Sequence, residues 1–131
     1  MRTNSKKLSV AILDDYQSVS HQFADWDEIS EKIELDVFKN YIGQEENLSN
    51  ILLKYDVLCL MRERTPLPED LINKLPNLKL VITSGMWNAS IDANALKKRN
   101  IVYCGTDTKI HSTAELAWVL IMNSWRGLQT E

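Results

Sequence analysis

Runs of apolar residues alternate along the chain with segments whose apolar residues recur at helical spacing. Continuous apolar runs bounded by Asp, Gly or Pro are typical of strands, and spacings of three and four residues are typical of helices. On this basis we expect strands at residues 8–13, 33–38, 56–61, 78–82 and 101–104. We expect helices at residues 25–29, 45–54, 68–74, 92–99 and 112–125.

The regular alternation of strand and helix, with short connections, predicts the fold class. Residues 1–131 are expected to form a single α/β domain. It should be a flavodoxin-like three-layer sandwich with a five-stranded parallel sheet of strand order 2-1-3-4-5, ending in a long apolar helix. Residues 33–38 alternate apolar and polar side chains, so they should form a strand with one wet face at an edge of the sheet.

The last predicted helix is apolar around most of its circumference. Residues 116–122 read Leu-Ala-Trp-Val-Leu-Ile-Met, and Trp125 follows. A helix that is hydrophobic on all sides needs partners on all sides, and one sheet covers only one of them. We therefore expect a homo-oligomer formed through residues 112–126. Ser112 and Glu115 have the spacing of a capping box at the start of this helix.

Composition and charge narrow the function classes. The 131 residues are 44% hydrophobic, enough for one core. The net charge of -3, with basic clusters only at residues 6–7 and 97–99, gives no reason to expect nucleic acid or a membrane as partner. No apolar run reaches membrane-spanning length, and the N-terminus has no secretory pattern. Cys59 and Cys104 are interpreted as buried thiols, so a cytoplasmic location is expected.

Residues 83–92, Thr-Ser-Gly-Met-Trp-Asn-Ala-Ser-Ile-Asp, follow the fourth predicted strand. Ligands of open parallel sheets bind outside the carboxyl ends of the strands, so this loop is the expected small-molecule site. Arg62 reaches the same edge and suits a carboxylate or phosphate, or alternatively pairs with Glu63 in a solvated loop. Asp14 and Asp15 could hold Mg²⁺, but we favour turn and helix-cap roles, which Asp often has.

Several motifs together resemble a known family. They are residues 61–66 (Met-Arg-Glu-Arg-Thr-Pro), 75–79 (Leu-Pro-Asn-Leu-Lys), 84–92, 103–106 (Tyr-Cys-Gly-Thr) and 113–118 (Thr-Ala-Glu-Leu-Ala-Trp). In this order and at these spacings the chain resembles the D-isomer-specific 2-hydroxyacid dehydrogenases, in particular phosphoglycerate dehydrogenase-like members, over essentially its whole length. The resemblance implies the N-terminal substrate-binding domain of an oxidoreductase that uses NAD or NADP.

In that family a second, Rossmann domain binds the cofactor and carries the catalytic arginine, acid and histidine. The four glycines of this chain, Gly43, Gly85, Gly105 and Gly127, cannot form the G-x-G-x-x-G fingerprint. Residues 1–131 are therefore expected to lack that domain, to bind no cofactor or metal, and to be inactive alone. The resemblance also accounts for the apolar last helix, which in the family is buried between domains and subunits.

The resemblance implies a substrate-binding role for five residues, Arg62, Ser84, Gly85, Met86 and Trp87. The backbone amides of Gly85 and Met86 would hold the carboxylate of a small 2-hydroxy or 2-oxo acid, and Arg62 matches the family's arginine after the third strand. Many members have a second glycine where this chain has Trp87, a departure that would narrow the pocket.

Two other function classes stay open. A non-catalytic interaction module would pair through its last helix with itself or with a full-length dehydrogenase. A phospho-receiver domain shares the predicted topology, and the acids after the first strand fit it. However, Met61 stands where the phospho-acceptor aspartate is expected, and Gly105 stands where a lysine is expected.

Overall fold

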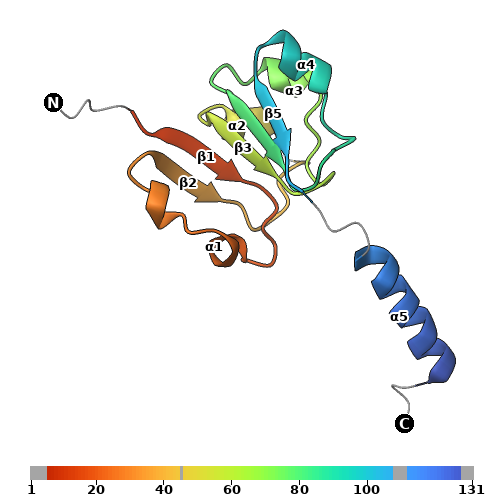
Figure 1. Ribbon diagram of the computed structural model, residues 1–131. Helices are drawn as coiled ribbons and strands as arrows, with labels where there is room; N and C mark the ends of the chain where they lie inside the picture. Colours follow the sequence, from red (N-terminus) through yellow and green to blue (C-terminus); the bar gives the residue numbers. More distant parts are fainter. Residues whose placement is uncertain (1–5, 45, 108–111, 128–131) are drawn as a thin grey trace.

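The computed structural model describes residues 6–44, 46–107 and 112–127 (Figure 1). The five strands form one parallel sheet in the order β2-β1-β3-β4-β5, which confirms the predicted fold class, the strand order and the place of β2 at an edge. The elements in chain order are β1 (Leu8–Ile12), α1 (Ser20–Phe23), the 3₁₀ helix η1 (Asp27–Ile29), β2 (Ile33–Val37), α2 (Leu48–Leu52), β3 (Val57–Leu60), α3 (Glu69–Asn73), β4 (Leu80–Thr83), α4 (Ala93–Lys98), β5 (Val102–Gly105) and α5 (Ser112–Arg126).

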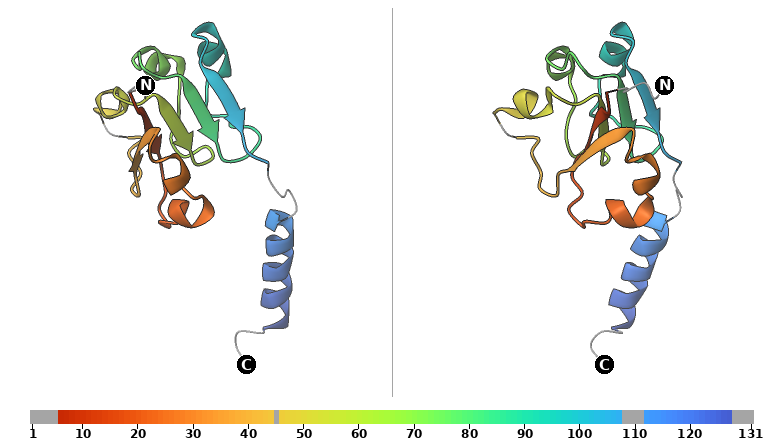
Figure 2. Two further views of the ribbon diagram at one scale, coloured as in Figure 1. Left: turned by 60° about the vertical axis from the view of Figure 1, so that its left-hand side comes forward. Right: turned by 90° about the vertical axis from the view of Figure 1, so that its left-hand side faces the viewer.

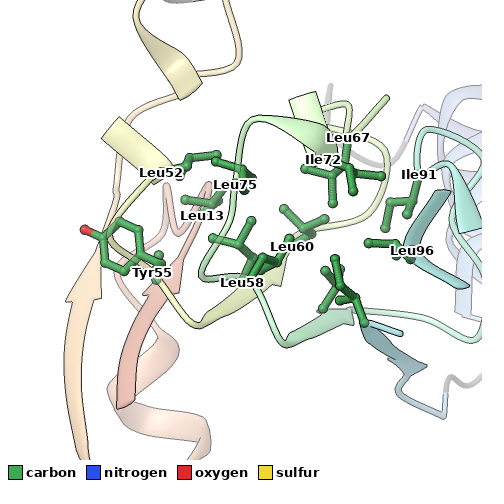
Figure 3. Close-up of a cluster of buried hydrophobic side chains, with 14 of the residues drawn as sticks. Leu13, Leu52, Tyr55, Leu58, Leu60, Leu67, Ile72, Leu75, Ile91 and Leu96 are labelled. Carbon is green, nitrogen blue, oxygen red and sulfur yellow. The ribbon is translucent and has the colours of Figure 1, made fainter. Parts of the chain in front are cut away.

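One face of the sheet is closed by helices and forms the main core. Ala11, Leu58 and Val81 lie in register on β1, β3 and β4, and all three are 0% exposed. Full burial of a side chain such as Leu58 or Val81 stabilises a fold by roughly 1.5–3 kcal/mol, so this face carries much of the stability. In Figure 3 the helices contribute Leu52, Ile72 and Leu96 to the same cluster.

The opposite face is covered only in part. In register across β1, β3, β4 and β5, the side chains of Ile12, Cys59, Ile82 and Cys104 change from buried through half-buried to exposed. The prediction of a buried thiol is therefore wrong for Cys104, because the described helices leave β5 uncovered on this face. Burial, with a smaller effect of nearby Cys104, raises the pKa of the Cys59 thiol to about 11.

Two predicted helices are shorter in the structure. Within residues 25–29 only the 3₁₀ turn η1 forms, because the Asp25 carboxylate accepts a hydrogen bond from the N–H of Asp27, two residues on. Such a turn competes with a helical cap. Of the helix predicted over residues 45–54, the structure contains Leu48–Leu52. The first residue of that prediction, 45, lies outside the described residues.

Helix α5 stands away from the sheet in both views of Figure 2, and none of its residues is buried. Its range agrees with the predicted helix. Ser112 is its first helical residue, so the cap position falls on residue 111, outside the described residues, and the capping box stays a prediction. No helix in the described part of the chain is long and apolar enough to cross a bilayer.

Candidate functional site

The carboxyl ends of β3, β4 and β5 bring the predicted site residues to one edge of the sheet. The N–H of Arg62 donates to Ser84 Oγ at 3.0 Å, which ties the loop after β3 to the loop after β4. The N–H of Gly85 donates to Thr106 Oγ1 at 2.9 Å, which ties the loop after β4 to the end of β5. Three strand ends are thereby joined around residues 84–87.

The backbone at Gly85 needs a glycine. Its φ is 104°, a conformation that L side chains rarely adopt. The Arg62 guanidinium lies directly over it, since a Cβ added to Gly85 would stand 2.8 Å from Arg62 Nη1. Arg62 itself has a φ of 50°, and non-glycine residues held in this region concentrate at functional sites. The structure thus packs a positive charge against the predicted substrate loop.

Asn88 was not among the predicted site residues, yet it holds these loops together. Its side chain is 2% exposed. Its Nδ2 donates to the Arg62 carbonyl oxygen and to Thr83 Oγ1, and its Oδ1 accepts from the N–H and the Oγ of Ser90. These four bonds use the full capacity of an amide side chain. An asparagine in a loop is too common to reveal such a role in a sequence.

The backbone donors that remain available differ from the predicted pair. The Gly85 N–H is already bonded to Thr106 Oγ1, so it reaches a ligand only by leaving that acceptor. The N–H groups of Met86 and Trp87 have no hydrogen-bond partner among the described residues. The two side chains are 75% and 71% exposed. The Trp87 ring therefore lies in solvent, and the narrowing expected from it does not occur in this structure.

A second arginine lies at the same edge of the sheet. The guanidinium carbon of Arg64 stands 4.2 Å from the centroid of the Tyr16 ring, in the geometry of a cation–π contact. The alternative in which Glu63 pairs with Arg62 is not seen, because Glu63 Oε1 accepts the N–H of Ala89 instead. Two guanidinium groups are therefore available at this edge without an ion pair to an acid of the described residues.

The two acids after β1 have structural roles. Asp15 accepts the N–H groups of Val19 and Ser20 at the start of α1, a local structural role of the kind favoured above, although the cap residue of this helix is Val19. Burial acts to raise the pKa of Asp15, but the hydrogen bonds from Ser20 and Val19 outweigh it and hold the pKa below its ordinary value. Asp14 is buried and accepts from Thr65 Oγ1 at 2.8 Å. In the described ranges no three acidic, His or Cys side chains gather to hold a metal ion.

A cavity of about 430 Å³ opens beside the loop, on the partly covered face of the sheet. Ser84 and Thr106 lie on its border, so it is continuous with the loop cluster. Helix α1 and the residues just after it, up to Trp26, form one wall, and the sheet forms the other. The apolar lining includes Ile12, Phe23, Trp26, Cys59 and Ile82.

Comparison with known proteins agrees with this arrangement. Residues 10–125 match the D-isomer specific 2-hydroxyacid dehydrogenase, catalytic domain. The chain is 32% identical to a phosphoglycerate oxidoreductase from Vibrio cholerae, with a TM-score of 0.76 over 88% of this chain and 36% of that one. For a Ralstonia solanacearum protein described as a D-3-phosphoglycerate dehydrogenase, the identity is 29% and the TM-score 0.76, over 89% and 35%.

A D-lactate dehydrogenase from Aquifex aeolicus shares the fold, with 22% identity and a TM-score of 0.68 over 87% of this chain and 33% of that one. No curated protein gives a significant match. The chain thus spans 36% and 35% of the length of its two more similar relatives.

The match over residues 10–125 leaves the phospho-receiver alternative without support. Because sequence match, strand order and loop architecture agree, this chain belongs to the D-isomer specific 2-hydroxyacid dehydrogenase family, in the part that corresponds to its catalytic domain.

Proposed function

We propose that this chain is the substrate-binding domain of a D-2-hydroxyacid dehydrogenase and holds the carboxylate of a small 2-hydroxy or 2-oxo acid. The observation that supports this most is the Arg62 guanidinium lying over Gly85, whose neighbour Met86 has an N–H without a hydrogen-bond partner in the described part of the chain. A carboxylate placed there accepts from both groups, and such charge-assisted bonds are the strong ones. Ser84 acts indirectly, since its Oγ holds the N–H of Arg62. Trp87 offers a further backbone donor.

A phosphorylated acid is the first substrate to test. The two more similar relatives are named for phosphoglycerate. In this chain Arg64 adds a second guanidinium at the same edge, held over Tyr16. Arginine suits both carboxylate and phosphate oxygens, so the pair Arg62 and Arg64 supports an acid that carries two anionic groups. D-lactate, which carries one, is the natural comparison.

Replacing Arg62 with alanine is expected to weaken binding of 3-phosphoglycerate about tenfold to a hundredfold. Hydrogen bonds to charged groups contribute about 1.5–3 kcal/mol, and tenfold corresponds to about 1.4 kcal/mol. Arg62 is exposed, so its loss should leave the fold unchanged. The dissociation constant is measured by titration of backbone amide chemical shifts, in which residues 84–87 should move.

Arg126→Ala is the matched control, because it removes an arginine from α5, away from the loop, with the same change of charge. Its dissociation constant should equal that of the unchanged chain. Equal affinities in Arg62→Ala and Arg126→Ala would show that the acid, if it binds, is held elsewhere, and the proposed role of Arg62 would be wrong.

The cofactor of the complete enzyme is proposed to be NAD or NADP, bound by a domain outside residues 1–131. The Aquifex aeolicus relative was solved with NAD and lactic acid. The glycines of this chain form no G-x-G-x-x-G, and that motif supplies the backbone amides for the pyrophosphate. The family match over residues 10–125 is to the catalytic domain, which supports this proposal.

The isolated chain is accordingly expected to be inactive. Mixed with NADH or NADPH and a series of 2-oxo acids, it should cause no loss of absorbance from the reduced cofactor beyond that of buffer. A complete D-lactate dehydrogenase, run in parallel with pyruvate, confirms that the assay detects turnover. Reproducible oxidation by residues 1–131 would contradict the assignment of the chemistry to another domain.

We also propose that this chain self-associates through α5. A non-catalytic interaction module would use the same helix. Seven of its large apolar side chains are between 39% and 85% exposed, and exposed apolar patches of this kind mark interaction sites.

We further propose that the protein is cytoplasmic. Cys59 and Cys104 are both unpaired thiols, and a reducing compartment keeps thiols in this state.

A further inference from the structure

The loop after β1, residues 14–18, borders the place where the strand order of the sheet reverses. In the sheet, β1 lies between β2 and β3 (Figure 1). Open parallel sheets bind ligands outside the carboxyl ends of the strands where the order reverses, and for the order 2-1-3-4-5 this point lies between β1 and β3. The loop after β1 and the loop after β3, which carries Arg62 and Arg64, therefore flank a favourable position for a ligand.

Backbone hydrogen bonds hold the loop after β1 in a defined shape. Of the four non-glycine residues with positive φ in the described part of the chain, Asp14 at 62° and Ser18 at 57° lie in this loop. Such conformations persist where the surrounding structure enforces them. The N–H of Tyr16 donates to the Asp14 carbonyl oxygen at 2.8 Å. The N–H of Ser18 donates to the Asp15 carbonyl oxygen at 2.9 Å. The backbone on both sides of Tyr16 is thereby constrained.

Two contacts join the loop after β1 to the loop after β3. Thr65 Oγ1 donates to Asp14 Oδ2 at 2.8 Å, and the two residues are 0% and 1% exposed, so water does not compete for this bond. One residue before Thr65, the Arg64 guanidinium carbon lies 4.2 Å from the centroid of the Tyr16 ring. Both of these side chains are exposed. The buried bond sets the spacing of the two loops, and the exposed contact holds the guanidinium where a ligand can reach it.

A ring contact suits an arginine that binds an anion. The π face of an aromatic ring attracts the cation without accepting its N–H donors in the way that a carboxylate does. Arg64 forms no ion pair with an acid of residues 6–44, 46–107 and 112–127. Its charge and its fork of donors therefore stay available, although the side chain is already held on one side.

We propose that Tyr16 is a positioning residue that gives this site a preference for an acid with a second, phosphate group, because it holds Arg64 for that group. The inference rests on the proposed function, in which Arg62 and residues 84–87 hold the carboxylate, and it adds the loop after β1. A side chain that is ordered beforehand loses less freedom on binding, so a held guanidinium binds phosphate more tightly than a free one. Binding of an acid without phosphate should not depend on Tyr16.

The test compares 3-phosphoglycerate with D-glycerate, which is the same acid without the phosphate. Tyr16→Leu removes the π face and keeps an apolar side chain. It should raise the dissociation constant of 3-phosphoglycerate about twofold to fivefold and leave that of D-glycerate unchanged. Tyr16→Phe keeps the ring and should bind both acids like the unchanged chain. The constants are measured by titration of backbone amide chemical shifts, in which residues 84–87 follow the carboxylate.

A double variant shows whether Tyr16 acts through the guanidinium. Arg64→Ala alone should weaken binding of 3-phosphoglycerate about tenfold or more and leave binding of D-glycerate unchanged. Adding Tyr16→Leu to Arg64→Ala should cause no further loss, because effects that pass through one shared contact are not additive. Tyr41→Leu is the matched control, since Tyr41 is also an exposed tyrosine, at 44%. It should bind both acids like the unchanged chain.

Three results would each overturn the inference. Equal weakening of both acids by Tyr16→Leu would mean that Tyr16 supports the carboxylate loop or the fold. Unchanged binding of 3-phosphoglycerate in Tyr16→Leu would mean that Arg64 needs no support from the ring. Additive losses in the double variant would mean that Tyr16 does not act through Arg64. As long as D-glycerate moves residues 84–87 of the unchanged chain, the proposed function stands in all three cases. If neither acid moved these residues, the proposed function would be wrong, and the inference with it.

Discussion

Replacing Asn88 with alanine is expected to lower the free energy of unfolding by about 2–4 kcal/mol. The side chain is 2% exposed and makes four hydrogen bonds. Its loss leaves Thr83 Oγ1, on a residue that is 0% exposed, and the part-buried Arg62 carbonyl oxygen and Ser90 N–H without these partners. A buried polar group left unsatisfied costs about 1–3 kcal/mol. Chemical denaturation followed by circular dichroism measures the difference.

The isosteric change Asn88→Asp separates hydrogen bonding from volume. An aspartate cannot donate to the Arg62 carbonyl oxygen or to Thr83 Oγ1, so it should destabilise about as much as alanine. Asn77→Ala is the matched control, because Asn77 is exposed and donates one hydrogen bond, to the Leu53 carbonyl oxygen. It should change the stability by less than about 0.5 kcal/mol. Similar values for Asn88→Ala and Asn77→Ala would contradict the role given to Asn88.

Gly105→Ala is expected to displace the substrate loop and to destabilise the chain by about 1–3 kcal/mol, the usual cost of overpacking. A Cβ at this position would stand 2.9 Å from the carbonyl carbon and oxygen of Met86 and closer still to the carbonyl oxygen of Gly85. All these atoms belong to the backbone, so the whole loop has to move. The bond from the Gly85 N–H to Thr106 Oγ1 is then strained or lost.

Thermal unfolding and amide chemical shifts measure both effects of Gly105→Ala. The shifts should change at residues 83–88 and at Thr106, and binding of 3-phosphoglycerate should weaken with them. Gly43→Ala is the control, since the three atoms nearest to its Cβ would all belong to the side chain of Tyr41. That ring is 44% exposed and can turn away. If Gly105→Ala left the loop shifts and the stability unchanged, the close contact between β5 and the loop would be wrong.

The strands and helices were predicted well from the local pattern of apolar residues where a short run of the chain is buried on both faces or on one face. Strand β3 lies within the predicted residues 56–61, and β4 begins two residues after the start of the predicted residues 78–82 and ends one residue beyond them. Helix α4 begins as expected, because the Asp92 carboxylate accepts the N–H of Ala95. Helix α1 was missed, since the N–H groups of Val19 and Ser20 at its start are held by the carboxylate of Asp15, four and five residues earlier, rather than marked by a periodic apolar pattern.

The sequence alone determined the fold class, the strand order, the loop of residues 84–87 and the family, because apolar periodicity and motif spacing are local properties of the chain. Only the tertiary structure decided how that loop is held. Thr106 accepts the Gly85 N–H, and Asn88, next to the loop, donates to the Arg62 carbonyl oxygen, across 21 and 26 residues of sequence that no pattern encodes. It also decided that the Gly85 N–H is occupied and that Cys104 is exposed, since both depend on which elements reach the same place in space.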